Sequence, residues 1–199
     1  MTSKDRIIKA TFDFVFALIG LILLLPIILL AWIVASIETR SNGFFLQKRV
    51  GKQGQFFTLF KIKTMQPVTG LYTHVTQAGD PRITLSGAFF RKTKIDELPQ
   101  LFNVLMGQMS FVGPRPDIQG YADKLQGEQR LILSLRPGIT GPASIKYRDE
   151  EVLLSQQDNP EQYNQQVIWP DKVKINMQYV KNWSLLSDIG YIYQTILGR

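Results

Sequence analysis

The longest hydrophobic segment of the chain lies near its N-terminus, where residues 14–37 carry no charged side chain. As an α-helix this segment measures about 36 Å, which exceeds the roughly 30 Å of a bilayer's hydrocarbon core. A secretory signal would have a shorter apolar stretch and a small-residue cleavage site, which Ala31-Trp32-Ile33 matches poorly. A buried helix of a soluble protein is a further alternative. The length of the run favours a helix in lipid.

Two features predict how this segment lies in a membrane. Pro26 stands at its centre, where the ring removes a backbone donor and clashes with the preceding turn, so the helix should bend there. Basic residues flank both ends, namely Lys4, Arg6 and Lys9 before the run and Arg40, Lys48, Arg49 and Lys52 after it. Because both flanks prefer the cytoplasmic side, we expect residues 1–40 to form a re-entrant helix and residues 41–199 a cytoplasmic domain. A straight spanning helix is the alternative, since such helices tolerate proline.

Residues 44–63 have the pattern of a β-hairpin. Aromatic and β-branched runs at residues 44–50 and 56–63 stand on either side of a Gly51-Lys52-Gln53-Gly54 turn. In the second run Phe60 and Ile62 alternate with Lys61 and Lys63, so one face should pack while the other presents ammonium groups. Residues 66–80 have little periodicity and predict a loop.

Helical periodicity returns further along the chain, at Leu98, Leu101, Phe102 and Leu105. Proline is tolerated only in a first turn, so Pro99 predicts a helix that begins near Asp96 or Glu97 and stops at Gly107. In one interpretation Asp96 is simply the N-cap of this helix. Residues 171–197 predict two more helices, broken near residues 182–184, whose Tyr and Trp suit a membrane interface or an ordinary core. These elements predict a mainly helical α+β fold with a small hairpin and interfacial amphipathic helices.

Two rigid turns each hold an arginine beside proline. They are Gly113-Pro114-Arg115-Pro116 and the segment 136–142, which begins with Arg136-Pro137-Gly138. An arginine fixed in this way can grip a phosphate through paired donors. The alternative is a pair of surface turns with solvated guanidinium groups.

Composition narrows the chemistry. The 199 residues include no Cys and one His, His74, which excludes disulfide scaffolds, thiolate zinc sites, iron–sulfur clusters and multi-histidine metal centres. Residues 1–95 hold 13 Lys or Arg against 4 Asp or Glu, whereas residues 96–199 hold 10 against 12. This asymmetry indicates an anionic partner for the first half: nucleic acid, lipid headgroups or a phosphorylated substrate. A solvated basic face is the alternative.

Taken together, the motifs resemble those of a known family. After the proline-broken segment they run in a fixed order: Lys48-Arg49-Val50-Gly51, then residues 60–65, Asp80-Pro81-Arg82-Ile83-Thr84, residues 91–105, residues 113–116 and residues 136–141. In this order the chain resembles the bacterial monotopic phosphoglycosyl transferases, or bacterial sugar transferase family, from about residue 5 to residue 197. It looks like a minimal catalytic unit without the extra membrane helices of larger members.

The resemblance implies a reaction. Family members move a sugar 1-phosphate from a UDP-sugar to polyprenyl phosphate, usually undecaprenyl phosphate, and release UMP, which starts a lipid-linked glycan such as an O-antigen, capsule or exopolysaccharide. The family's Asp-Glu dyad maps onto Asp96 and Glu97. Asp96 would be the nucleophile that forms an aspartyl-phosphosugar intermediate. Glu97 would assist it, together with a Mg²⁺ that Asp96 and Glu97 hold.

Physical chemistry agrees with these implied roles. A carboxylate attacking a diphosphate is repelled unless cations neutralise the site, and Mg²⁺ suits a site that offers only oxygen ligands. The expected phosphate-binding residues are Arg91, Arg115 and Arg136, with Lys61 and Lys63 as further candidates.

The chain also departs from the family pattern. Leu25 stands before Pro26, where relatives often carry Ser, and residues 142–149 replace a familiar Trp and Asn-Gly-Arg-Asn segment. We therefore assign Thr140, Tyr147 and Arg148 only as candidates for nucleotide or sugar recognition.

The implied partners are a UDP-sugar, polyprenyl phosphate and membrane lipids, with no nucleic acid, at the cytoplasmic face of the bacterial inner membrane. The sugar, the pathway and the oligomeric state, including a homo-oligomer, stay open. A membrane-anchored protein that binds anions without chemistry is the rival hypothesis.

Overall fold

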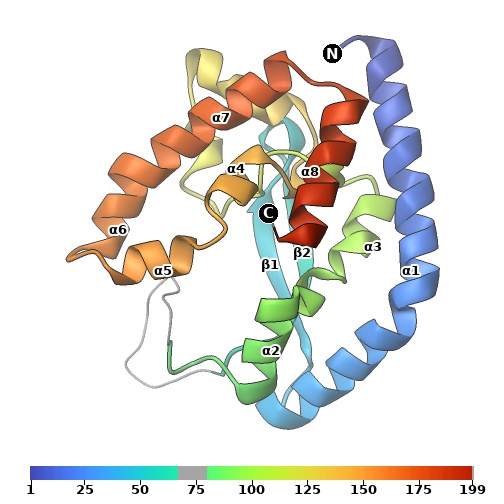
Figure 1. The fold of residues 1–199 in the computed structure, drawn as a ribbon, viewed down its shortest axis with the longest axis vertical. Coiled ribbons are helices and arrows are strands. Elements are labelled where there is room, and N and C mark those ends of the chain that lie inside the picture. Colours follow the sequence, from blue (N-terminus) through green and yellow to red (C-terminus); the bar gives the residue numbers. More distant parts are fainter. Residues whose placement is uncertain (67–79, 199) are drawn as a thin grey trace.

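The computed structural model describes residues 1–66 and 80–198, so most of the predicted loop, with His74, lies outside the described residues. Helix α1 spans Ser3–Thr39 without interruption and contains Pro26. Figure 1 shows that it runs along one side of the molecule and turns toward α2 in its second half. Among the described residues α1 is the one helix long and apolar enough to cross a membrane, and only 17% of its most apolar window is buried.

The predicted hairpin is confirmed. Strands β1 (Phe44–Val50) and β2 (Phe56–Ile62) pair antiparallel, with Phe44 opposite Ile62 and Val50 opposite Phe56. Their connection is a 3-10 turn at Lys52–Gly54, in which Gln53 and Gly54 have positive φ angles of 58° and 81°. Glycine allows this reversal without strain at its own position.

Short elements follow the hairpin and surround it. In chain order they are α2 (Leu85–Thr93), a 3-10 turn (Ile95–Glu97), α3 (Gln100–Leu105), β3 (Ser110–Val112), two 3-10 segments (Ala122–Lys124 and Gly127–Ser134), β4 (Gly138–Thr140), α4 (Pro142–Lys146), α5 (Glu150–Ser155), α6 (Pro160–Tyr163), a π turn (Asn164–Ile168), α7 (Trp169–Lys181) and α8 (Leu185–Leu197). The fold is therefore mainly helical α+β, as predicted, and the break between α7 and α8 falls at the predicted place. The helix after the dyad is a correction, because α3 begins at Gln100 rather than near Asp96.

Helix α1 packs against the other elements along its length. In its first half Ala17 joins Leu59, Leu101 and Val104 in one hydrophobic cluster, which connects α1 to β2 and α3. In its second half Ala31 and Ala35 pack with Ile62 and Phe90. The opposite face of α1 stays exposed and apolar, with Ile22 67% and Leu23 70% accessible. One side of α1 thus belongs to the protein core, and the other side is an exposed apolar surface of the kind that marks a membrane or protein contact.

Polar contacts fix both ends of α1 to the same body. Near the start, Lys9 Nζ lies 2.5 Å from Asp188 Oδ2 on α8, with side chains only 7% and 1% exposed. Asp188 also accepts hydrogen bonds from Tyr179 Oη at 2.7 Å and Trp183 Nε1 at 3.0 Å. Near the end, the Glu38 carboxylate accepts from the Ser86 hydroxyl at the start of α2. Residues 9 and 38 are therefore both anchored on the domain that follows. The predicted division at residue 40 stays an interpretation of the sequence, since α1 and the domain pack together.

The two glycine-proline turns lie side by side. Strands β3 and β4 pair in parallel, and their continuations exchange main-chain bonds: Gly113 N donates to Thr140 O at 2.9 Å, and Gly138 N donates to Pro114 O at 2.9 Å. A Cβ on Gly138 would lie 2.1 Å from Gly113 N. Only glycine permits so close an approach of two backbones. The folding of these strands therefore places Arg115 and the segment after Gly141 next to each other.

Candidate active site

The predicted carboxylate pair lies in the turn between α2 and α3. Lys94 ends α2 with a left-handed backbone (φ 60°), and the 3-10 turn Ile95–Glu97 follows directly. The N-cap interpretation of Asp96 is wrong, because Pro99 holds the N-cap position of α3 and Asp96 lies inside the 3-10 turn that precedes it. The Asp96 side chain is buried, and within the described residues its Oδ1 atom has no hydrogen-bond partner. A buried carboxylate oxygen without a donor is costly and needs a functional or ligand-dependent explanation.

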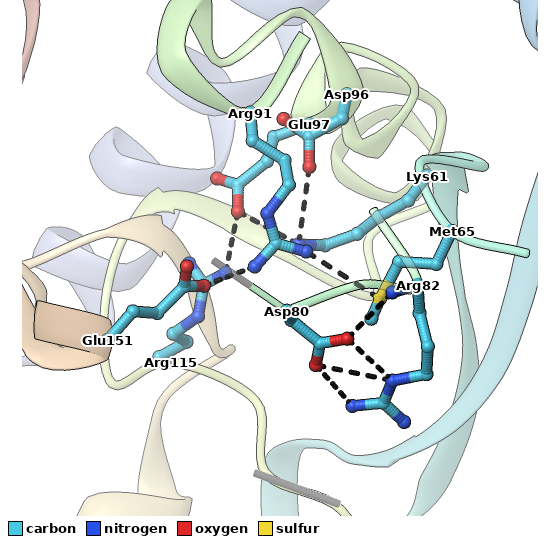
Figure 2. A network of polar contacts seen from close by, with 9 residues as sticks. All are labelled: Lys61, Met65, Asp80, Arg82, Arg91, Asp96, Glu97, Arg115 and Glu151. Atoms are coloured by element: carbon cyan, nitrogen blue, oxygen red, sulfur yellow. Dashed lines mark hydrogen bonds and ion pairs between the residues drawn. The ribbon is translucent and has the colours of Figure 1, made fainter. Parts of the chain in front are cut away.

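Two cations contact this pair directly, as Figure 2 shows. Lys61, from β2, places Nζ 2.9 Å from Glu97 Oε1 and 3.9 Å from Asp96 Oδ2. Arg115, from the turn after β3, donates through Nη2 to the same Glu97 oxygen at 2.6 Å. The alternation predicted for β2 thus holds at Lys61, whose ammonium faces the carboxylates. Glu97 takes both of these direct hydrogen bonds, and the buried Asp96 Oδ1 is left without a partner in the described part of the chain.

The two neighbouring carboxyl groups are shifted in opposite directions. Burial by itself raises the pKa of Glu97, but Arg115 and Lys61 together outweigh it and hold that pKa well below its usual range. For Asp96, burial dominates and raises the pKa, although Lys61 acts against it. Glu97 is therefore a fixed anion at neutral pH, which binds the cations. Asp96 is a desolvated acid beside them, and desolvation makes its carboxylate more reactive toward an electrophile.

Arg91 brings a further cation to the same region. It extends from α2 toward Lys61 and the dyad (Figure 2), where Nη2 pairs with Glu151 on α5 and Nη1 lies 3.8 Å from Met65 Sδ. Nearby, Arg82 binds the Asp80 carboxylate, with Nη2 2.6 Å from Oδ2. The hydrogen bonds from Arg82 hold the pKa of Asp80 below its usual value and outweigh burial, which acts in the opposite direction.

Two predicted phosphate-binding residues make their contacts with groups other than the dyad. Lys63 donates through Nζ to Ser41 Oγ at 2.8 Å, beyond the end of α1. The Arg136 guanidinium lies against Gly107, with Nη2 3.5 Å from where a Cβ would stand. Their roles toward a substrate stay predictions.

The candidates for nucleotide or sugar recognition contact the C-terminal helices. Thr140 Oγ1 lies 2.6 Å from Thr195 Oγ1 on α8, and Arg148 Nη2 donates to Gln194 O at 3.1 Å. The Tyr147 hydroxyl donates to Asp171 Oδ2 on α7 at 2.7 Å. These contacts attach the segment after β4 to α7 and α8. Recognition of a substrate by these residues stays a prediction.

Arg49 and Asp117 lie close to the site but were not among the predicted site residues. Arg49 Nη1 donates to Pro116 O at 3.1 Å, and burial together with the charge of Arg115 lowers the pKa of Arg49 to about 10. Burial raises the pKa of Asp117 to about 7, against the charges of Lys172, Arg49 and Arg115. Only the Lys48-Arg49-Val50-Gly51 motif could have pointed to Arg49, since Pro116, its partner beside the site, is 67 residues away in sequence.

The dyad also fits the implied metal. The described residues contain no group of three or more His, Asp or Glu that could hold an ion alone. Mg²⁺ needs no such group, because it is commonly bound by one or two carboxylates with phosphate oxygens and water. The unpartnered Asp96 Oδ1 and the adjacent Glu97 supply carboxylate oxygens of this kind. The site thus combines two carboxylates with three nearby cations, which suits the binding and attack of an anionic phosphate.

Comparison with known proteins gives a consistent answer. The sequence profile of the family described as Bacterial sugar transferase matches residues 4–198. A Bacillus subtilis protein, provisionally named as an undecaprenyl-phosphate N-acetylgalactosaminyl 1-phosphate transferase, is 45% identical over 128 residues, which are 64% of this chain and 72% of that protein.

Two longer relatives match nearly the whole chain. The undecaprenyl-phosphate galactose phosphotransferase of Salmonella typhimurium is 32% identical over 96% of this chain and 40% of its own length. The UDP-glucose:undecaprenyl-phosphate glucose-1-phosphate transferase of Escherichia coli is 30% identical over 98% of this chain and 41% of its own length. The chain therefore spans less than half of these two relatives. A profile match over nearly all residues, together with these relatives, shows that the chain belongs to the bacterial sugar transferase family.

Proposed function

We propose that this protein transfers a sugar 1-phosphate from a UDP-sugar to undecaprenyl phosphate and releases UMP. The observation that carries the proposal is Asp96, a buried acid with one unpartnered oxygen, placed beside Lys61 and the cation-bound Glu97. The relatives' names supply the substrate classes: an undecaprenyl-phosphate acceptor for both longer relatives, and a UDP-sugar donor for the Escherichia coli relative.

In the proposed first step, Asp96 Oδ1 attacks the sugar-bearing phosphorus of the donor. A new carboxyl O–P bond forms while the P–O bond to UMP breaks, and UMP leaves with that electron pair. In the second step an oxygen of undecaprenyl phosphate attacks the same phosphorus and the Asp96 carboxylate leaves, which regenerates the enzyme. A covalent intermediate lets one small site serve two bulky substrates in turn.

The neighbouring residues have distinct parts in this proposal. Lys61, Arg91 and Arg115 offset the negative charge of the diphosphate, which would otherwise repel Asp96. Glu97 stays ionised and fixes Lys61 and Arg115 through its Oε1 atom. Mg²⁺ bound by the dyad would supply additional charge neutralisation on the phosphate oxygens.

The contacts of α1 support a position at the membrane surface. A straight spanning helix would carry one of its ends across a hydrocarbon core of about 30 Å. Lys9 and Glu38, near opposite ends of α1, instead contact α8 and α2 of the same body. We therefore propose that α1 is re-entrant, that its exposed apolar face meets lipid and that the domain lies on the cytoplasmic face of the inner membrane. Such a position brings Asp96 to a lipid-anchored acceptor.

The decisive experiment concerns Asp96. UMP release is measured with undecaprenyl phosphate, Mg²⁺ and a panel of UDP-glucose, UDP-galactose and UDP-N-acetylgalactosamine. Asp96→Asn should abolish release with every donor, whereas Asp158→Asn, at an exposed position, should leave it unchanged. Protein quenched with donor alone should carry a sugar-phosphate mass on Asp96. Turnover of Asp96→Asn at the wild-type rate would refute the assignment of Asp96 as the nucleophile. Anion binding by the wild type without turnover would support the rival hypothesis of a binding protein without chemistry.

Topology has a separate test, because the chain contains no native cysteine. Ser3→Cys is probed in intact cells and in inverted vesicles with a membrane-impermeant thiol reagent. Asp158→Cys marks the side on which the domain lies. Re-entry predicts that both cysteines react only in inverted vesicles. Labelling of Ser3→Cys in intact cells would refute it.

A further inference from the structure

Arg49 is a charged residue beside the site that the proposed mechanism does not use. It lies at the end of β1, where Nη1 donates to Pro116 O at 3.1 Å and Nη2 donates to Gln47 Oε1 at 2.6 Å. Its Nε atom is buried and has no hydrogen-bond partner in the described part of the chain. A partly buried guanidinium that feels the positive charge of Arg115 is unfavourable for stability. A residue that breaks a local rule in this way, next to a site, points to a functional role.

The partner of Arg49 is the turn that carries Arg115. One flank of this turn is fixed by main-chain bonds, in which Gly113 N donates to Thr140 O and Gly138 N donates to Pro114 O. The other flank is fixed from β1, where Arg49 bonds Pro116 O and Val50 N donates to Asp117 O at 2.8 Å. Between these flanks Arg115 reaches Glu97 Oε1 at 2.6 Å. Contacts from the end of β1 thus fix one of the two flanks of the turn whose Arg115 guanidinium binds Glu97.

We propose that Arg49 is a positioning residue for the transfer reaction, which acts through the Pro116 carbonyl to hold the Arg115 guanidinium on Glu97. Within the described residues Arg49 makes no hydrogen bond or ion pair with Asp96 or Glu97, and Glu97 acts on it only through a weaker charge effect, so its main route to the dyad is through Arg115. The catalytic part of this inference rests on the proposed function, whereas its structural part does not.

Hydrogen exchange tests the structural part. In Arg49→Gln the amides of residues 113, 115 and 117 should exchange about tenfold faster, since a hydrogen bond from a charged group is lost from the turn. Lys48→Gln is the matched control, because Lys48 is the exposed neighbour on the same strand, and its exchange should stay within about twofold of wild type. Unchanged exchange in Arg49→Gln would overturn the proposal. If Arg49→Gln does not unfold cooperatively, Arg49→Lys is used in its place. We then expect faster exchange only in this turn, and faster exchange throughout the chain would contradict the proposal.

A double-mutant cycle with Arg115 tests the catalytic part. UMP release is followed with the best donor of the panel in Arg49→Gln, Arg115→Ala and the double variant. Arg49→Gln should lower release about 10- to 100-fold, the usual effect of misplacing a catalytic group. In the Arg115→Ala background the same change should lower release less than about twofold. Independent, multiplying losses would show that Arg49 does not act through Arg115. A wild type that releases UMP from no donor would contradict the proposed function, while the exchange result would still decide the role of Arg49.

Discussion

Asp188→Asn removes the negative half of the buried ion pair that fixes the start of α1 to α8. The asparagine keeps one acceptor oxygen for Tyr179, but its amide nitrogen cannot accept from Trp183 or Lys9, so the change leaves Lys9 as an unpaired buried cation and Trp183 without this acceptor. Losing one partner of a buried pair costs about 3–5 kcal/mol. In a chain of 199 residues each kcal/mol shifts Tm by about 2–4 °C, so we expect Tm to fall by about 6–20 °C.

The measurement is thermal unfolding in lipid nanodiscs, followed by circular dichroism, with Lys9→Met as the reciprocal single variant. Lys9→Met combined with Asp188→Leu removes both charges and should recover part of the loss, because a buried ion pair can often be replaced by apolar side chains. Recovery should be incomplete, since Trp183 Nε1 loses its acceptor while Tyr179 keeps Val112 O at 3.2 Å. Single variants that melt within about 2 °C of wild type would refute a buried, stabilising pair.

Three further predictions follow from the same structure. Gly138→Ala should destabilise the protein by several kcal/mol, because its Cβ would collide with Gly113 N. Gly190→Ala has open space around the new Cβ and should stabilise α8 by about 0.5–1 kcal/mol. Melting curves of the two variants test both expectations. The raised pKa of Asp117, about 7 against an ordinary 3.8, means that the folded state binds this proton more tightly than the unfolded state. The contribution of Asp117 to stability should therefore fall between pH 4 and 7. The Tm advantage of Asp117→Asn over the wild type should grow across this range, and a pH-independent difference would contradict the prediction. Glu151→Gln should change Tm little, since the Glu151 side chain is 44% exposed. It should lower the KM for the UDP-sugar, because Arg91 loses its carboxylate partner and can bind the substrate phosphate. An unchanged KM would count against Arg91 as a phosphate ligand.

Local patterns predicted the local elements well. The hairpin formed because its two aromatic runs and glycine turn leave one register in which the apolar residues pack. Helices α7 and α8 separate where the polar Asn182 and Ser184 interrupt the apolar periodicity, and Ser184 then caps α8. Long segments with a clear period carry their own structural information.

The arrangement of the site depended on contacts that no local pattern contains. Pro99 correctly indicated that the helix after the dyad does not begin at Thr93. The tight 3-10 turn at Asp96, however, follows the left-handed backbone of Lys94, and the sequence has no glycine at this position that would have indicated it. Arg115 and Arg136 look equivalent in sequence, yet only Arg115 reaches Glu97, because the paired turns direct the two side chains differently. Arg49 was missed since its role depends on a carbonyl 67 residues away.

The close contact of the glycine backbones has a practical meaning for redesign. Gly141 meets Gly113 O so closely that a Cβ there would lie 2.4 Å away, and α4 starts at the next residue. A substitution of Gly141 itself would therefore also displace the turn that carries Arg115, the arginine that contacts Glu97. A chimera of two family members should therefore take both turns, residues 113–116 and 136–141, from the same parent protein.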